Sequence, residues 1–144
     1  MVAHKPRVLI AEDDPDTLVI LRINLTAAGM EPMLAGDGRT ALERIEAESP
    51  DAVLLDVLLP GIDGWQVLEQ LHTKGDPVPV IVCSGKDNIH DLQRARELGA
   101  VAYLVKPFDI DRLIEVTSEV VGVRQGGSAV ARGTAADADG VELV

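Results

Sequence analysis

Four apolar stretches of this sequence end in side chains that could do chemistry together. These side chains are Glu12 and Asp13, Asp56, Ser84 and Lys106. Carboxylates brought together repel each other, so the pKa of one should rise unless a cation neutralises them. Oxygen ligands without histidine or cysteine favour a hard cation, and Mg²⁺ combines a few carboxylates with waters and phosphate oxygens. The set therefore indicates a magnesium site that handles phosphate.

Asp56 is the candidate nucleophile, because it follows the most apolar stretch and no helix start is adjacent to it. A carboxylate beside Mg²⁺ can attack phosphorus and form an aspartyl phosphate. The metal and Lys106 would neutralise charge on the phosphoryl oxygens, and Ser84 could hydrogen-bond to one of them. Taken singly, these residues have plainer roles as helix caps, turn residues or solvated charges. Their shared position at strand ends carries the prediction.

Short apolar stretches alternate with amphipathic ones five times between residue 7 and about residue 123. The expected strands are 7–11, 32–36, 51–57, 78–85 and 101–105. Asp14 and Asp109 are expected to cap the first and last helices. Strands that alternate with helices imply right-handed crossovers and a parallel sheet covered on both faces. In such a sheet ligands bind beyond the carboxyl ends of the strands, where the reactive residues fall.

Composition narrows the class of protein. The 144 residues fit one domain, expected at 1–123, and a Gly/Ala-rich flexible tail or linker at 124–144. Docking of residues 141–144 on the domain is the alternative. A net charge of −11 and few aromatics argue against direct nucleic-acid binding. No apolar run reaches the ~20 residues of a membrane span, so a cytoplasmic location without membrane contact is expected. The lone Cys83 excludes an intrachain disulfide.

The sequence resembles the receiver domain of two-component response regulators over about 120 residues. Four motifs match in order and spacing, and they read VLIAEDDPDT, LLDVLLPGIDGWQVL, VIVCSGK and YLVKPF. The resemblance implies a flavodoxin-like, doubly wound fold: a five-stranded parallel sheet of order 2-1-3-4-5 with five helices. It also implies a signalling protein rather than an enzyme.

The resemblance assigns a role to each matching residue. Asp56 would be phosphorylated, and Mg²⁺ would be held by Glu12, Asp13, Asp56 and the backbone carbonyl of Leu58. Family members usually carry Asp-Asp at the acidic pair, so Glu12 is a variant that would bind through water. Ser84 and Lys106 would contact the phosphoryl group, and Tyr103 would report activation through its rotamer. The bond between Lys106 and Pro107 is expected to be cis.

The resemblance also implies partners. The phosphoryl donor would be a sensor histidine kinase or a phosphotransfer protein. The face built from the fourth helix, fifth strand and fifth helix would change its affinity for a downstream protein, and it could also form a homodimer.

The first helix has more apolar residues than one core-facing stripe requires. Leu18, Leu21 and Leu25 can fill that stripe, Val19 then faces outward, and Ile20 or Ile23 flanks the core. We hypothesise that this surplus surface, with Leu18 and Val19 as candidate contacts, docks the helical domain of the kinase. An ordinary partly exposed apolar residue is the alternative.

Three other functions remain as competitors. A haloacid-dehalogenase-type phosphatase also uses a strand-end aspartate with Mg²⁺, but it normally has a second acid two residues later, where this chain has Leu58. A receiver-like module could bind partners without phosphorylation. A transcription factor would need an output domain beyond residue 123, so the chain could also be a receiver fragment of a longer regulator.

Overall fold

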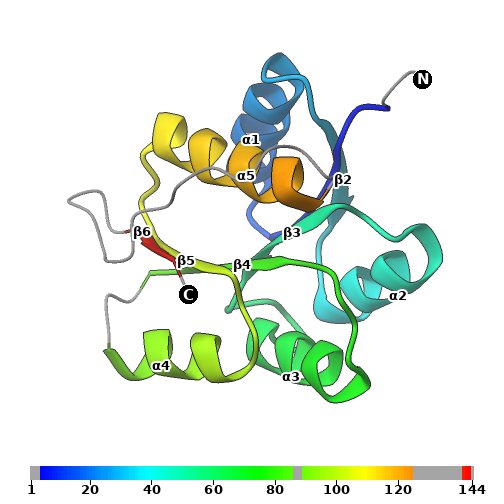
Figure 1. The fold of residues 1–144 in the computed structure, drawn as a ribbon, viewed down its shortest axis with the longest axis vertical. Helices are drawn as coiled ribbons and strands as arrows, with labels where there is room; N and C mark the ends of the chain where they lie inside the picture. Colours follow the sequence, from blue (N-terminus) through cyan, green and yellow to red (C-terminus); the bar gives the residue numbers. More distant parts are fainter. Residues whose placement is uncertain (1–3, 86–88, 125–140, 144) are drawn as a thin grey trace.

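The computed structural model describes residues 4–85, 89–124 and 141–143, and it places six strands in one sheet (Figure 1). The strands are β1 (Arg7–Ala11), β2 (Glu31–Ala35), β3 (Ala52–Asp56), β4 (Val80–Ser84), β5 (Ala102–Val105) and β6 (Val141–Leu143). The helices are α1 (Pro15–Ala27), α2 (Gly38–Glu48), α3 (Gly64–Lys74), α4 (Ile89–Glu97) and α5 (Ile110–Arg124). The spatial order is β2-β1-β3-β4-β5-β6, with β1 to β5 parallel. The expected flavodoxin-like order 2-1-3-4-5 is confirmed.

Helices cover both faces of the sheet. Figure 1 shows α1 and α5 on one side, and α2, α3 and α4 on the other. Successive strand residues point to opposite faces. In β1, for example, Leu9 packs in the cluster with α2 and α3, whereas Val8 and Ile10 pack in the cluster with α1 and α5. Because both faces are buried, the central strands β1, β3 and β4 are apolar along most of their length and not alternately polar.

The first and last helices have the caps that the sequence predicts, and α3 has a further one. The side chain of Asp14 accepts a hydrogen bond from the backbone N–H of Thr17, with Pro15 in the first turn. Asp109 accepts in the same way from Arg112, at 3.2 Å. Asp63 and Gln66 form a reciprocal capping box at the start of α3. These caps therefore end the loops that follow β1, β3 and β5 at defined residues.

The C-terminal segment differs from the expected flexible tail. Helix α5 includes Arg124, and Val141–Leu143 form β6, which pairs antiparallel with β5. This is the docking alternative, and it adds a strand that the fold prediction did not contain. A three-residue strand carries little periodic signal, so only the open edge of β5 could have suggested it. The expected tail residues 125–140 and 144 lie outside the described residues.

Among the described residues, no helix combines the length and apolar character that crossing a bilayer requires.

Candidate functional site

The predicted reactive residues converge at the carboxyl ends of the parallel strands. Asp56 is the last residue of β3 and Ser84 the last of β4, while Glu12 and Lys106 directly follow β1 and β5. The register sets them at one level: Ala11 pairs with Leu55, and Asp56 with Cys83. Parallel strands in this register bring residues far apart in the sequence to the same edge. The prediction that strand ends meet is therefore confirmed.

Lys106 bridges two buried carboxylates. Its Nζ lies 2.7 Å from Oε1 of Glu12 and 3.2 Å from Oδ2 of Asp56. Glu12 is only 3% exposed and Asp56 only 5%. Without the lysine, either acid would be a buried charge with no opposite charge beside it, which is costly. The lysine therefore balances part of the negative charge at the end of the sheet.

Burial and charge act in opposite directions on this cluster. Burial raises the pKa of the Glu12 carboxyl, although the hydrogen bond from Lys106 works against that rise. Burial alone would lower the pKa of the Lys106 ammonium, but its contacts with Glu12 and Asp56 outweigh this effect, so the pKa is raised. The site therefore holds Lys106 firmly charged and makes a negative charge on Glu12 harder to maintain.

The donor set fits a hard cation. Carboxylate oxygens of Glu12, Asp13 and Asp56 lie within 4.8 Å of one another, and Asp13 is exposed. A cation that prefers oxygen ligands and keeps several waters could enter from the side of Asp13. The three carboxylates carry three negative charges when ionised, and Lys106 balances one of them. A divalent cation would balance the other two, whereas a monovalent cation would leave one unbalanced. These residues fit Mg²⁺.

The loop after β3 fixes the carboxylate of Asp56. The backbone N–H of Leu58 donates to Oδ1 of Asp56 at 3.1 Å, while the side chain of Leu58 is 74% exposed. The N–H of Val57 donates to the carbonyl of Cys83, and the N–H of Gly64 to the carbonyl of Val57. These bonds tie the loop to β4 and α3. The metal contact expected from the Leu58 carbonyl stays a prediction.

Gly64 is a site residue that the sequence reasoning missed. A Cβ atom at this position would lie 2.2 Å from the backbone oxygen of Asp56 and 2.6 Å from Cα of Val57. Only glycine allows the start of α3 to approach the end of β3 so closely. Nothing in the sequence indicates this close approach, because it depends on how α3 packs against the end of β3.

The remaining predicted residues have different surroundings. Ser84 is buried, and its carbonyl accepts a 2.8 Å bond from the backbone N–H of Lys106. The peptide bond between Lys106 and Pro107 is cis. Tyr103 is buried in the core cluster that includes Ala95 of α4. The structure therefore brings Ser84 and Lys106 to the acidic site, and places Tyr103 in the core on the side of the sheet that α4 covers (Figure 1).

Apolar residues surround a groove beside the site. A groove of about 500 Å³ lies between α1 and the loop that follows β5, and Lys106 contributes to its wall. The other lining residues are Thr17, Ile20, Leu21, Pro107, Phe108 and Ile110. Val19, Ile20 and Ile23 of α1 are exposed, the last at 59%. Val19 faces outward as expected, Leu18 is half-buried, and Ile20 and Ile23 are both more exposed than expected. The sequence did not predict that Pro107, Phe108 and Ile110 line this groove.

Comparison with known proteins agrees with this geometry. The family model described as the response regulator receiver domain matches residues 8–118. The transcriptional activator protein IrlR of Burkholderia pseudomallei is 42% identical over 123 residues, which are 85% of this chain and 52% of that protein. The transcriptional regulatory protein PcoR of Escherichia coli is 39% identical over 108 residues, or 75% of this chain and 48% of that protein. The chain thus spans about half the length of these relatives.

Solved structures of similar extent share the fold. The receiver domain of the Francisella response regulator 1452 superposes with a TM-score of 0.80 at 29% identity, over 83% of this chain and 98% of that one. A CheY-like receiver domain protein from Methanospirillum hungatei gives a TM-score of 0.78 at 27% identity, over 85% and 98%. The converging acids and lysine, the family match and these likenesses lead to one conclusion: the chain belongs to the response regulator receiver domain family.

Proposed function

We propose that this receiver domain accepts a phosphoryl group on Asp56 in a Mg²⁺-dependent reaction. The donor would be the phosphohistidine of a sensor histidine kinase or of a phosphotransfer protein. The observation that carries the proposal is the contact of Lys106 with both Glu12 and Asp56 beside the exposed Asp13. A carboxylate nucleophile, a fixed cation and a divalent-cation donor set then meet at one strand end.

The carboxylate of Asp56 is held ready for attack. Its Oδ1 accepts the hydrogen bond from Leu58, and its Oδ2 faces Lys106. One of its oxygens attacks the phosphorus, the bond between phosphorus and the imidazole nitrogen breaks, and that nitrogen keeps the electron pair. The charge of Lys106, which already lies 3.2 Å from Oδ2 of Asp56, would stabilise the phosphoryl oxygens. Preorganised charge of this kind lowers the barrier because it is in place before the reaction.

Glu12, Asp13, Asp56 and the carbonyl of Leu58 would hold the Mg²⁺, with Glu12 acting through a water molecule. When bound, the metal neutralises negative charge on the phosphoryl oxygens. Burial is the main cause of the raised pKa of Glu12, and the neighbouring charge of Asp56 adds to it; a bound cation would offset both effects by favouring the ionised carboxyl.

The phosphorylation test uses acetyl phosphate as a small donor, with detection by intact-protein mass spectrometry. We expect one phosphoryl adduct in the presence of Mg²⁺, and none after chelation or in Asp56→Asn. Asp76→Asn is the matched control, because Asp76 lies at the opposite edge of the sheet, on the loop before β4. An adduct that persists in Asp56→Asn would refute the assignment. Absence of any adduct in the unaltered chain would favour the phosphorylation-independent module.

Phosphorylation would then shift a conformational equilibrium. Ser84 is the last residue of β4, beside the acidic site. Tyr103 lies on β5, three residues before Lys106, and belongs to the core cluster that includes Ala95 of α4. We infer that Ser84 moves toward the phosphoryl group and that Tyr103 repacks. The phosphoryl group can shift the equilibrium only by its unequal interaction with the two states. A downstream protein would recognise the altered face formed by α4, β5 and α5.

The kinase would dock on α1 and the neighbouring groove. Val19, Ile20 and Ile23 give α1 an exposed apolar surface, and Leu18 supports it from below. The groove wall includes Lys106, so a partner seated there reaches the site. The proposal therefore extends the docking surface from Leu18 and Val19 to Ile20 and Phe108.

A charge at the docking surface tests this idea. We expect Val19→Glu to slow phosphotransfer from a cognate histidine kinase, while leaving reaction with acetyl phosphate unchanged. Ala47→Glu is the control, since Ala47 is exposed on α2, on the other side of the sheet. Equal transfer rates for Val19→Glu and the unaltered chain would exclude α1 as the docking surface.

A further inference from the structure

The two edges of the five-stranded parallel sheet are protected in different ways. An edge strand presents unpaired N–H and C=O groups, which invite another strand unless proline, charge or a cover prevents it. Strand β2 begins with the exposed Glu31 followed by Pro32, which has no N–H to offer. Strand β5 reads Ala-Tyr-Leu-Val and contains neither a charge nor a proline. Its edge therefore has no protection within its own sequence.

Strand β6 covers the unprotected edge. It runs antiparallel to β5, with Leu143 opposite Ala102, Glu142 opposite Tyr103 and Val141 opposite Leu104 (Figure 1). The new edge strand has three residues with an acidic one at its centre. Short and charged edge strands are the features that resist further strand addition. Strand β6 thus gives this side of the sheet a short, acidic outer strand, which β5 by itself does not provide.

We propose that β6 is a displaceable cover, contributed by the same chain, which prevents a second copy of this chain from pairing along β5. Residues 125–140 tether β6 to α5, so its return to β5 is intramolecular. A tethered segment acts at an effective concentration on the order of mM, which favours it over a free competitor. A ladder of only three residues is also short enough to open.

The partner that fits the uncovered edge is the β5 strand of a second copy. Two such edges can pair about a twofold axis, since each offers the same unpaired groups. The pairing would use the backbone groups of β5 that β6 now covers. The cover would therefore decide whether the edge of β5 is available to a second copy.

A proline substitution tests the cover in the full-length chain. Replacing Val141, Glu142 and Leu143 together by proline removes every N–H of β6, whichever of them bonds to β5. Replacing the same three residues by threonine keeps the N–H groups and a side chain suited to strands. Hydrogen exchange followed by mass spectrometry measures protection of residues 102–105, and sedimentation velocity measures self-association over a wide dilution series.

In the proline variant we expect exchange of β5 to be roughly tenfold faster, because a covered edge strand opens less often than a bare one. We also expect dimers at roughly tenfold lower protein concentration than in the threonine variant. Unchanged protection in β1 and β3 would show that the proline variant is folded.

Three results would overturn the proposal. Equal β5 protection in the proline and threonine variants would mean that β6 does not pair in solution. Loss of β5 protection in the unaltered chain on dilution would mean that the covering strand comes from a second copy. A proline variant that loses protection and stays monomeric would mean that the cover does not control self-association. None of these measurements involves phosphorylation, so failure here leaves the assignment of Asp56 untouched.

Discussion

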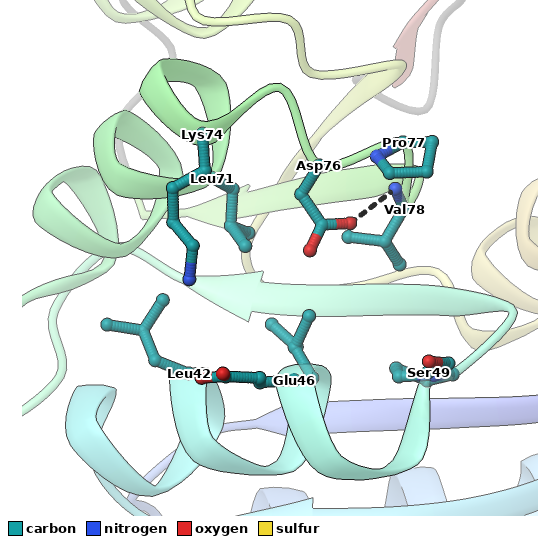
Figure 2. Close-up of a pocket in the computed structure, with 10 residues that line it drawn as sticks. Leu42, Glu46, Ser49, Leu71, Lys74, Asp76, Pro77 and Val78 are labelled. Carbon is teal, nitrogen blue, oxygen red and sulfur yellow. Dashed lines mark hydrogen bonds between the residues drawn. The ribbon is translucent and has the colours of Figure 1, made fainter.

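The two ends of the sheet carry the same kinds of charged residue in different settings. At the carboxyl end, Glu12, Asp56 and Lys106 are in contact at 2.7 and 3.2 Å, and both acids are buried. At the amino end, Glu46 and Lys74 from α2 and α3, together with Asp76, line a pocket of about 270 Å³ (Figure 2). Glu46 and Lys74 are exposed there, and within the described part of the chain Lys74 makes no ion pair.

The difference lies in what holds the side chains. Asp56 ends a buried strand, and its carboxylate accepts a hydrogen bond from the Leu58 N–H, so its charge is both buried and held in one position. Asp76 instead accepts a hydrogen bond from the Val78 N–H at 3.0 Å and organises its own loop (Figure 2). Exposed charges on helices are screened by water and interact weakly. Two carboxylates and a lysine therefore form a reactive site only where strands deliver them into a buried edge.

The largest difference in stability between variants at the two ends of the sheet should come from replacing the glycines that flank α3. In Gly64→Ala the new Cβ would meet backbone atoms of Asp56 and Val57, which cannot move away cheaply. We expect the free energy of unfolding to fall by about 3 kcal/mol, as for overpacking of a tight interior. In Gly75→Ala there is open space but a φ of 69°, so about 1 kcal/mol is expected from backbone strain.

Urea unfolding of both variants measures this contrast. Phosphorylation of Asp56 should also slow in Gly64→Ala, because the strain acts on the backbone that carries the carboxylate. A Gly64→Ala variant no less stable than Gly75→Ala would show that the loop after β3 yields easily, against the fixed geometry described here.

A second difference in stability is expected between variants of Lys106 and Lys74, which lie at opposite ends of the sheet. Lys106→Met leaves Glu12 and Asp56 buried together without a counter-charge. We expect the free energy of unfolding to fall by about 2 kcal/mol. This is less than for a fully buried pair, because the lysine side chain is 27% exposed. Lys74→Met should change the free energy of unfolding by no more than about 0.5 kcal/mol, as is usual for surface substitutions.

Chemical unfolding without Mg²⁺ is the appropriate measurement, because a bound cation would replace the missing charge. Adding Asp56→Asn to Lys106→Met should recover part of the loss, since it removes one of the repelling carboxylates. If the two lysine variants proved equally stable, the ion pairs of Lys106 would contribute nothing to the fold.

The smallest contrast should appear as a pH dependence of stability. Because burial raises the pKa of Glu12, the native state holds its proton at pH values where the unfolded chain has released it. The free energy of unfolding should then fall as pH rises from the usual glutamate pKa toward the raised native value. Glu12→Gln should remove this fall, and Glu46→Gln at the other end should retain it. Urea unfolding over this pH range, without Mg²⁺, tests the sign; parallel curves for the two variants would contradict it.

Much of this molecule follows directly from its sequence. Doubly buried strands need continuous apolar runs, so the runs before Glu12 and Asp56 located β1 and β3 and placed the acids at one edge. Side-chain caps act within three or four residues, so Asp14 and Asp109 could be read as helix starts without any tertiary information. Alternation of strand and helix then determined the parallel topology.

Other features were decided only by the tertiary structure, because they depend on which distant segments meet. The bond between Lys106 and Glu12 joins residues 94 positions apart, and its length depends on strand register and side-chain reach. The closeness of Gly64 to Asp56 depends on how α3 packs against the end of β3. The pairing of β6 depends on an edge that exists only after the sheet has assembled. Local sequence patterns predict which residues are reactive, but the contacts between these residues arise from the long-range packing that buries them.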